Sequence, residues 1–66
     1  ISPTREVTEF LEENIQGEKA AIANYRQRIR QIQDRYIQAV LEQIIQEEEA
    51  HIEIFRKYLE YFRREE

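Results

Sequence analysis

Three side chains with metal-binding chemistry interrupt two helical stripes that are otherwise apolar. Positions four and three residues apart in the first half of the chain are apolar except at Glu18, and Glu48 and His51 interrupt the equivalent stripe of the second half. An unpaired buried carboxylate costs several kcal/mol, so these positions predict something that compensates the charge. A bound metal ion is the simplest candidate. The two stripes contain Leu11, Ile15, Glu18, Ile22, Tyr25, Ile29 and Ile32, and Ile37, Leu41, Ile44, Glu48, His51, Phe55, Leu59 and Phe62.

The spacing of the three residues indicates which of them can bind the same ion. Glu48 and His51 are three residues apart, so on a helix they project from one face, one turn apart. Glu18 would face them across a hairpin, and a two-fold dimer would gather four carboxylates and two imidazoles. Four negative charges balance two divalent cations, and a Glu from each of two helices with Glu-x-x-His from the other two is typical of di-iron bundles. Oxygen and imidazole ligands without sulfur suit iron or manganese, and they also accept zinc or cobalt.

The elements that must position these residues are helices. The 66 residues include a single Pro and a single Gly, helix-forming residues dominate, and no stretch alternates with the period of a strand. The sequence therefore predicts an all-α fold, with residues 1–66 forming one domain. So short a chain buries little apolar surface, and self-association is expected.

Capping signals predict where the two helices begin. Ser2 can cap a helix that starts at Pro3, because Pro suits the first helical position, and Asp34 is the best cap for a second helix. We therefore expect helices over about 3–32 and 35–64, joined by a turn near 33–34. Two such helices make an antiparallel hairpin with one face uncovered, and two hairpins would complete a four-helix bundle.

Composition excludes several classes of protein. The chain has no Cys, so thiolate ligands, zinc fingers and Cys nucleophiles are excluded. The net charge is −4, and the ten basic residues are dispersed among fourteen acids, which argues against nucleic-acid binding and against an anionic membrane surface. We also find no apolar run of membrane-spanning length and no signal peptide, so a cytoplasmic location is expected.

Two segments of the sequence resemble the ferritin-like and rubrerythrin-like superfamily. They are the run GEKAAIANYR at residues 17–26 and the run QEEEAH at residues 46–51. The separation of 30 residues from Glu18 to Glu48 is most similar to encapsulated ferritins, short two-helix proteins that complete a di-iron site only by dimerising. The resemblance implies a ferritin-like four-helix bundle made by a homodimer. It also implies that Glu18, Glu48 and His51 are iron ligands, with two irons per dimer, and that Tyr25 lies beside the centre.

The resemblance further implies an activity and partners. The expected activity is that of a ferroxidase, which oxidises Fe(II) with dioxygen or hydrogen peroxide, and the Fe(III) product would be stored. The protein would be cargo of an encapsulin nanocompartment and would assemble as a ring of several dimers. The chain departs from encapsulated ferritins at Gly17 and Ala20, where those proteins usually carry further acids.

Two other interpretations stay open at this point. The same site could serve a rubrerythrin-like di-iron peroxidase, which would need an external electron donor because no Cys-rich module is present. Alternatively, the chain could be a non-enzymatic helical dimerisation module, in which Glu18 and His51 form a buried hydrogen-bonded pair that fixes the register. Tyr25 has two interpretations as well, either core packing or a redox role beside the metal.

Overall fold

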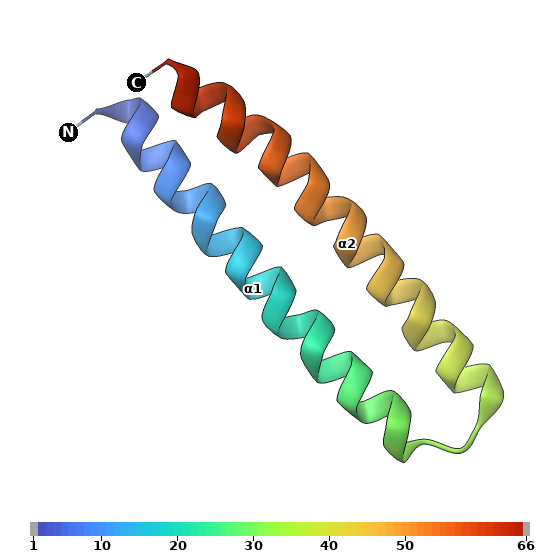
Figure 1. The fold of residues 1–66 in the computed structure, drawn as a ribbon. Helices are drawn as coiled ribbons and strands as arrows, with labels where there is room; N and C mark the ends of the chain where they lie inside the picture. Colours follow the sequence, from blue (N-terminus) through green and yellow to red (C-terminus); the bar gives the residue numbers. More distant parts are fainter. Residues whose placement is uncertain (1, 66) are drawn as a thin grey trace.

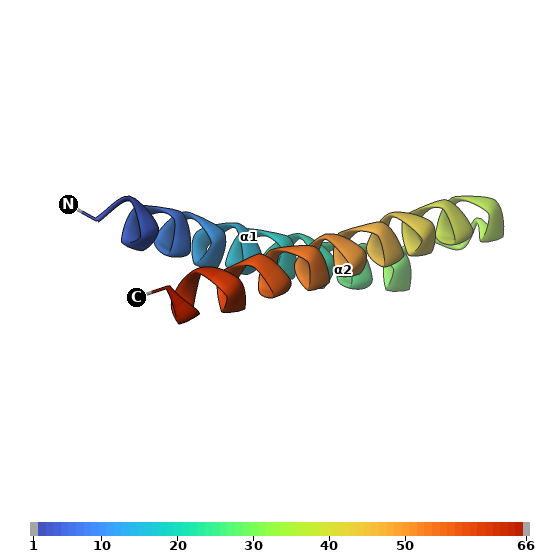
Figure 2. The same ribbon diagram turned by 90° about the horizontal axis from the view of Figure 1, so that it is seen from above.

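Two antiparallel helices account for almost all of the 2–65 segment that the computed structural model describes. Helix α1 spans Pro3–Gln31 and helix α2 spans Arg35–Arg64, and the two lie side by side along their whole lengths (Figure 1). Seen from above, they form one layer and cross each other gradually (Figure 2). The Cα atoms extend over 49 × 16 × 11 Å. The expected all-α hairpin is confirmed.

Both helices begin at side chains that cap their first turns. The Ser2 hydroxyl accepts a hydrogen bond from the backbone N–H of Arg5 at 3.4 Å, and Pro3 occupies the first helical position of α1. In α2, Asp34 Oδ1 accepts a hydrogen bond from the backbone N–H of Ile37 at 3.0 Å. Each cap satisfies a backbone donor that has no partner within the helix.

The turn is held by a side chain, since no Gly or Pro occurs in it. Ile32, which the sequence placed at the end of the first helix, has an extended backbone, as does Asp34. The Gln38 amide reaches back from the first turn of α2 and donates hydrogen bonds to the carbonyl oxygens of Ile29 and Ile32. It therefore gives a partner to the Ile32 carbonyl and a second donor to the Ile29 carbonyl, which also accepts from the backbone N–H of Ile32.

The hairpin core is a row of aliphatic side chains between the two helices. Within α2, the most buried residues are Ile45 at 4% exposure and Ile52 at 6%, not Ile44 and His51 of the predicted stripe. The predicted stripe therefore misses Ile45 and Ile52, each one residue beyond a stripe position, whereas Leu59 of the same stripe does lie in the core. The buried aliphatic residues are Leu11, Ile15, Ile22, Ile45, Ile52 and Leu59.

A single layer of two helices leaves the other faces of each helix open. Large apolar side chains on α2 are consequently exposed, including Val40 at 41%, Ile54 at 51% and Tyr58 at 50%. Phe10 of α1 is 63% exposed, so it does not lie in the core of the hairpin. No helix in the described part of the chain combines the length and apolar character needed to cross a membrane.

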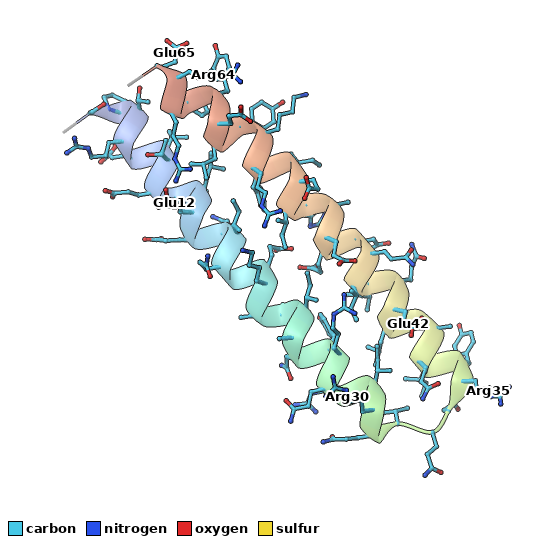
Figure 3. The ribbon with its side chains drawn as sticks, in the orientation of Figure 1. Glu12, Arg30, Arg35, Glu42, Arg64 and Glu65 are labelled. Carbon is cyan, nitrogen blue, oxygen red and sulfur yellow. The ribbon has the colours of Figure 1, made fainter. Side chains whose placement is uncertain are left out.

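Two ion pairs tie the helices together on their solvent-exposed side. Arg26 of α1 pairs with Glu49 of α2 at 3.3 Å, and Glu12 of α1 pairs with Arg63. Figure 3 shows Glu12 toward the open end of the hairpin, whereas Arg30, at the other end, lies near the turn. Each pair is about half exposed and stabilises the hairpin by at most about 1 kcal/mol.

Candidate metal centre

The three candidate ligands come from the middle of the two helices. Glu18 lies near the centre of α1, whereas Glu48 and His51 lie near the centre of α2, one turn apart. Because the helices are antiparallel and joined by a short turn, their midpoints lie at the same level. The structure thus brings Glu18 together with Glu48 and His51, which follow it in the sequence by 30 and 33 residues.

The ligand atoms are close enough to bind one ion. One nitrogen of His51 and one oxygen from each carboxylate lie within 4.8 Å of one another. His51 Nδ1 and Glu18 Oε2 lie 3.5 Å apart. Metal bonds to such atoms are about 2.1 Å long, so two ligands of one ion lie at most about 4.2 Å apart. Small rotations of these side chains are enough to reach that separation.

The site lies at the border between the core and the uncovered face. The Glu18 side chain is 23% exposed, but that of His51 is 53% exposed. A single hairpin therefore leaves His51 exposed, and the burial of His51 between two hairpins stays a prediction. The reason is geometric, because the predicted stripe of α2 faces the side that no part of this chain covers.

The Glu18 carboxyl group disturbs the ionisation of Glu48. A hydrogen bond with Glu18 is the largest cause that raises the pKa of Glu48 above its ordinary value, followed by burial and by the charge of Glu18. The imidazole of His51 acts in the opposite direction, and Glu47 adds a small upward effect. Glu18 Oε2 is buried and accepts no hydrogen bond from the described residues, and the nearest basic atom is His51 Nδ1 at 3.5 Å. The neutral imidazole does not offset the two carboxylates, so this oxygen can accept a further positive partner.

These features fit a divalent cation. A cation bound by Glu18, Glu48 and His51 would give the buried Glu18 oxygen a partner and would offset the repulsion between the carboxylates. Two oxygen ligands and one imidazole suit iron, manganese, zinc or cobalt. Three protein ligands also leave positions on the ion that a substrate could occupy.

Neighbouring residues separate into two groups. Tyr25 is half-buried and packs against the hydrophobic core, so its redox role stays a prediction. Glu49, which adjoins the ligand Glu48, is engaged by Arg26 on the solvent side. No local signal predicts the pairing of Arg26 with Glu49, because they are 23 positions apart and surface charges pair in many ways.

The chain is a helical hairpin with a cluster of two carboxylates and one histidine at its midpoint, and this cluster could bind a metal ion. Comparison with protein families identifies the chain further: the model of the ferritin-like domain matches residues 2–65. The chain belongs to the ferritin-like family. Searches of curated proteins and of solved structures return no match.

Proposed function

We propose that two copies of this chain pair into a four-helix bundle that binds two iron ions and oxidises Fe(II) to Fe(III). The observation that carries the proposal is the cluster of Glu18, Glu48 and His51, whose ligand atoms lie within 4.8 Å of one another in a family that is ferritin-like. Iron is the substrate of this reaction, and the oxidised product would be the form that is stored.

The exposed apolar surface next to the site supports the pairing. Ile37, Val40, Ile54 and Tyr58 are 41–51% exposed on α2, and His51 lies among them in sequence. Apolar area buried in an interface contributes about 25 cal/mol per Å² before the costs of association. A second copy covering this face would also enclose the ligands, and no other part of the described chain can do so.

The ligand count supports two irons in each pair. A pair of hairpins supplies four carboxylates and two imidazoles, which matches the charge of two divalent ions. Carboxylate ligands stabilise Fe(III) more than Fe(II), because the higher charge gains more from each negative oxygen. The site therefore favours the product of oxidation over the substrate.

The reaction balances with an external oxidant. Two Fe(II) ions each lose one electron, and dioxygen takes up these two electrons with two protons to give hydrogen peroxide. With hydrogen peroxide as the oxidant, the two electrons cleave the O–O bond and give two hydroxide ions. Glu18, Glu48 and His51 hold the two ions close together, and Tyr25 is proposed to lie beside them, where its phenol can supply an electron or orient a ligand. Delivery to an encapsulin shell is proposed from the resemblance alone.

Iron oxidation by purified variants tests the proposal. We expect the wild-type protein to oxidise anaerobically loaded Fe(II) rapidly when oxygen is added, as measured by the absorbance of Fe(III) in stopped flow. Glu18→Ala and His51→Ala each remove a ligand, and we expect the rate to fall to that of iron in buffer. Glu42→Ala, an exposed acid on the same helix, is the matched control and should keep the wild-type rate.

The outcomes also distinguish the two alternatives. A rubrerythrin-like peroxidase should oxidise iron much faster with hydrogen peroxide than with dioxygen and should turn over with an added electron donor. A dimerisation module should bind no iron, and its ligand variants should pair as tightly as the wild type. Either ligand variant retaining the full oxidation rate would contradict the ferroxidase proposal.

A further inference from the structure

We infer that two copies of the chain pair through α2 as an antiparallel coiled coil centred near residue 49, and that Glu47 of the partner subunit positions the His51 imidazole. The inference rests on the proposed function, because it assumes that two copies pair. It adds the register of the pairing and a residue that one copy supplies to the other. Glu47 is not a proposed ligand, and the contact that we infer for it does not require a bound metal.

A stripe of α2, which we call the pairing stripe, has the spacing of a coiled coil. Its positions are alternately three and four residues apart, as the a and d positions of a heptad repeat are, and Glu47 and His51 occupy its middle. Five of its apolar side chains are 41–56% exposed, whereas the core residues Ile45, Ile52 and Leu59 are at most 7% exposed. The stripe is therefore free to contact a second helix. Its apolar members are Ile37, Val40, Ile44, Ile54, Tyr58 and Tyr61.

The pairing stripe is symmetric about residue 49. When two copies of one helix run antiparallel about a two-fold axis, positions equally far from the axis face each other. Glu47 and His51 each lie two residues from the centre, so each would face the other residue of the second copy. The apolar members also match in pairs, which lie twelve, nine and five residues on either side of the centre: Ile37 with Tyr61, Val40 with Tyr58, and Ile44 with Ile54.

The two polar members of the stripe select this register over others. A shift by one heptad would place Glu47 against apolar side chains, where a carboxylate without a partner is strongly unfavourable. A parallel pairing in register would instead place the two copies of Glu47 against each other, and like charges repel. Of these three arrangements, only the antiparallel one centred near residue 49 gives the Glu47 carboxylate a hydrogen-bond donor.

His51 has a ring nitrogen that can be this donor. Its Nδ1 lies 3.5 Å from Glu18 Oε2 of the same chain, which leaves Nε2 on the other side of the ring, in a side chain that is 53% exposed. Glu47 is exposed, and among the described residues it forms no hydrogen bond or ion pair. If Nε2–H donates to Glu47 of the partner subunit, the ring is held with Nδ1 toward Glu18. Such a hydrogen bond to a carboxylate is the usual way in which the ring of a metal-binding histidine is oriented.

Disulfide cross-linking tests the register, and the chain suits this test because it has no Cys of its own. We expect an oxidised mixture of Val40→Cys and Tyr58→Cys to form a covalent dimer that contains one chain of each variant, identified by its mass. Neither variant alone should cross-link, because the two copies of residue 40 would lie about 27 Å apart, far beyond the Cα separation of about 7 Å that a disulfide allows. A mixture of Ile37→Cys and Tyr61→Cys repeats the test at a second pair.

Nitrogen-15 NMR of the metal-free dimer tests the role of Glu47 without iron oxidation, because His51 is the only His in the chain. We expect a hydrogen-bonded Nε2–H signal in the wild type and in Glu47→Gln, whose amide oxygen still accepts, and loss of the signal in Glu47→Ala. The exposed acid Glu42 on the same helix provides the matched control, Glu42→Ala, which should keep the signal. Mixing labelled Glu47→Ala with unlabelled His51→Ala should restore it, because the labelled His51 then faces an intact Glu47 of the partner subunit.

The possible results separate this inference from the proposed function. A dimer that cross-links in neither mixture, or that cross-links in either variant alone, would overturn the register. A wild type without the Nε2–H signal, a signal that survives in Glu47→Ala, or one that His51→Ala does not restore, would overturn the role of Glu47. In each of these cases, a wild-type dimer that oxidises Fe(II) leaves the proposed function standing. A wild-type protein that stays monomeric would overturn both.

Discussion

Replacing Glu48 with Gln should abolish metal binding at the proposed site and, at the same time, stabilise the metal-free protein. Glu48 and Glu18 present ligand oxygens within 4.8 Å of each other, and like charges at this separation repel by about 1 kcal/mol even in water-like surroundings. A Gln amide removes the repulsion and can donate a hydrogen bond to the buried Glu18 Oε2, worth about 1 kcal/mol more. We therefore expect the free energy of unfolding at pH 7 to rise by about 1–2 kcal/mol in the presence of a chelator.

The stabilisation by Glu48→Gln should be larger at pH 7 than at pH 4, because the pKa of Glu48 is raised in the folded protein. This pKa is raised in the folded protein above the ordinary value of 4.5, so the folded wild type holds the proton more tightly than the unfolded chain does. The resulting stabilisation is complete below pH 4.5 and is lost as the pH rises through the raised folded pKa. Near pH 4 the wild type already has a protonated Glu48 that can donate to Glu18, so the advantage of Glu48→Gln should largely disappear.

Urea unfolding followed by circular dichroism, at pH 7 and pH 4 with EDTA, measures both effects. Glu42→Gln removes an exposed charge from the same helix and should change stability by less than about 0.5 kcal/mol at either pH. The reasoning would be refuted if Glu48→Gln were less stable than the wild type at pH 7, or if its advantage were equally large at pH 4.

Four further substitutions test the fold. Ile52→Ala should lower the free energy of unfolding by about 2–4 kcal/mol in urea denaturation. Ile54→Ala, at a 51% exposed position, should lower it by less than about 1 kcal/mol in the unpaired hairpin. Equal losses in the two variants would contradict the assigned core. Asp34→Ala removes the cap of α2 and should cost about 1 kcal/mol, so an unchanged unfolding midpoint would count against this role. Gly17→Ala should stabilise α1 by about 1 kcal/mol, because an added Cβ meets nothing within 4 Å, and a loss of thermal stability would indicate that a second copy approaches there.

The helices were predictable from the sequence because their signals are local. Pro3 and the capping residues Ser2 and Asp34 mark the helix starts within a few residues, and the structure shows both caps. The hydrogen bonds from the Gln38 amide to the carbonyl oxygens of Ile29 and Ile32 were not predictable, since they depend on how the turn places the two helices. Local signals indicate where helices form, but the contacts between helices can be assigned only from the structure.

The ligand cluster was predictable for a related reason, but its burial was not. Glu48 and His51 share a helix face by spacing alone, and the position of the turn places Glu18 opposite them. Periodicity does not show which part of a broad apolar face packs against the other helix. Ile45 and Ile52 therefore lie in the core, whereas the predicted stripe contained the adjacent positions Ile44 and His51. The apolar face of α2 is wider than one helix can cover, and the sequence alone cannot divide it between the hairpin and a second copy.

Mass measurement of the intact protein after anaerobic addition of Fe(II) tests the central claim most directly. The account predicts a species of two chains with two iron ions, absent from Glu18→Ala and His51→Ala samples treated in the same way. A protein that stays monomeric and free of iron, or a dimer whose iron content is unaffected by either substitution, would contradict it.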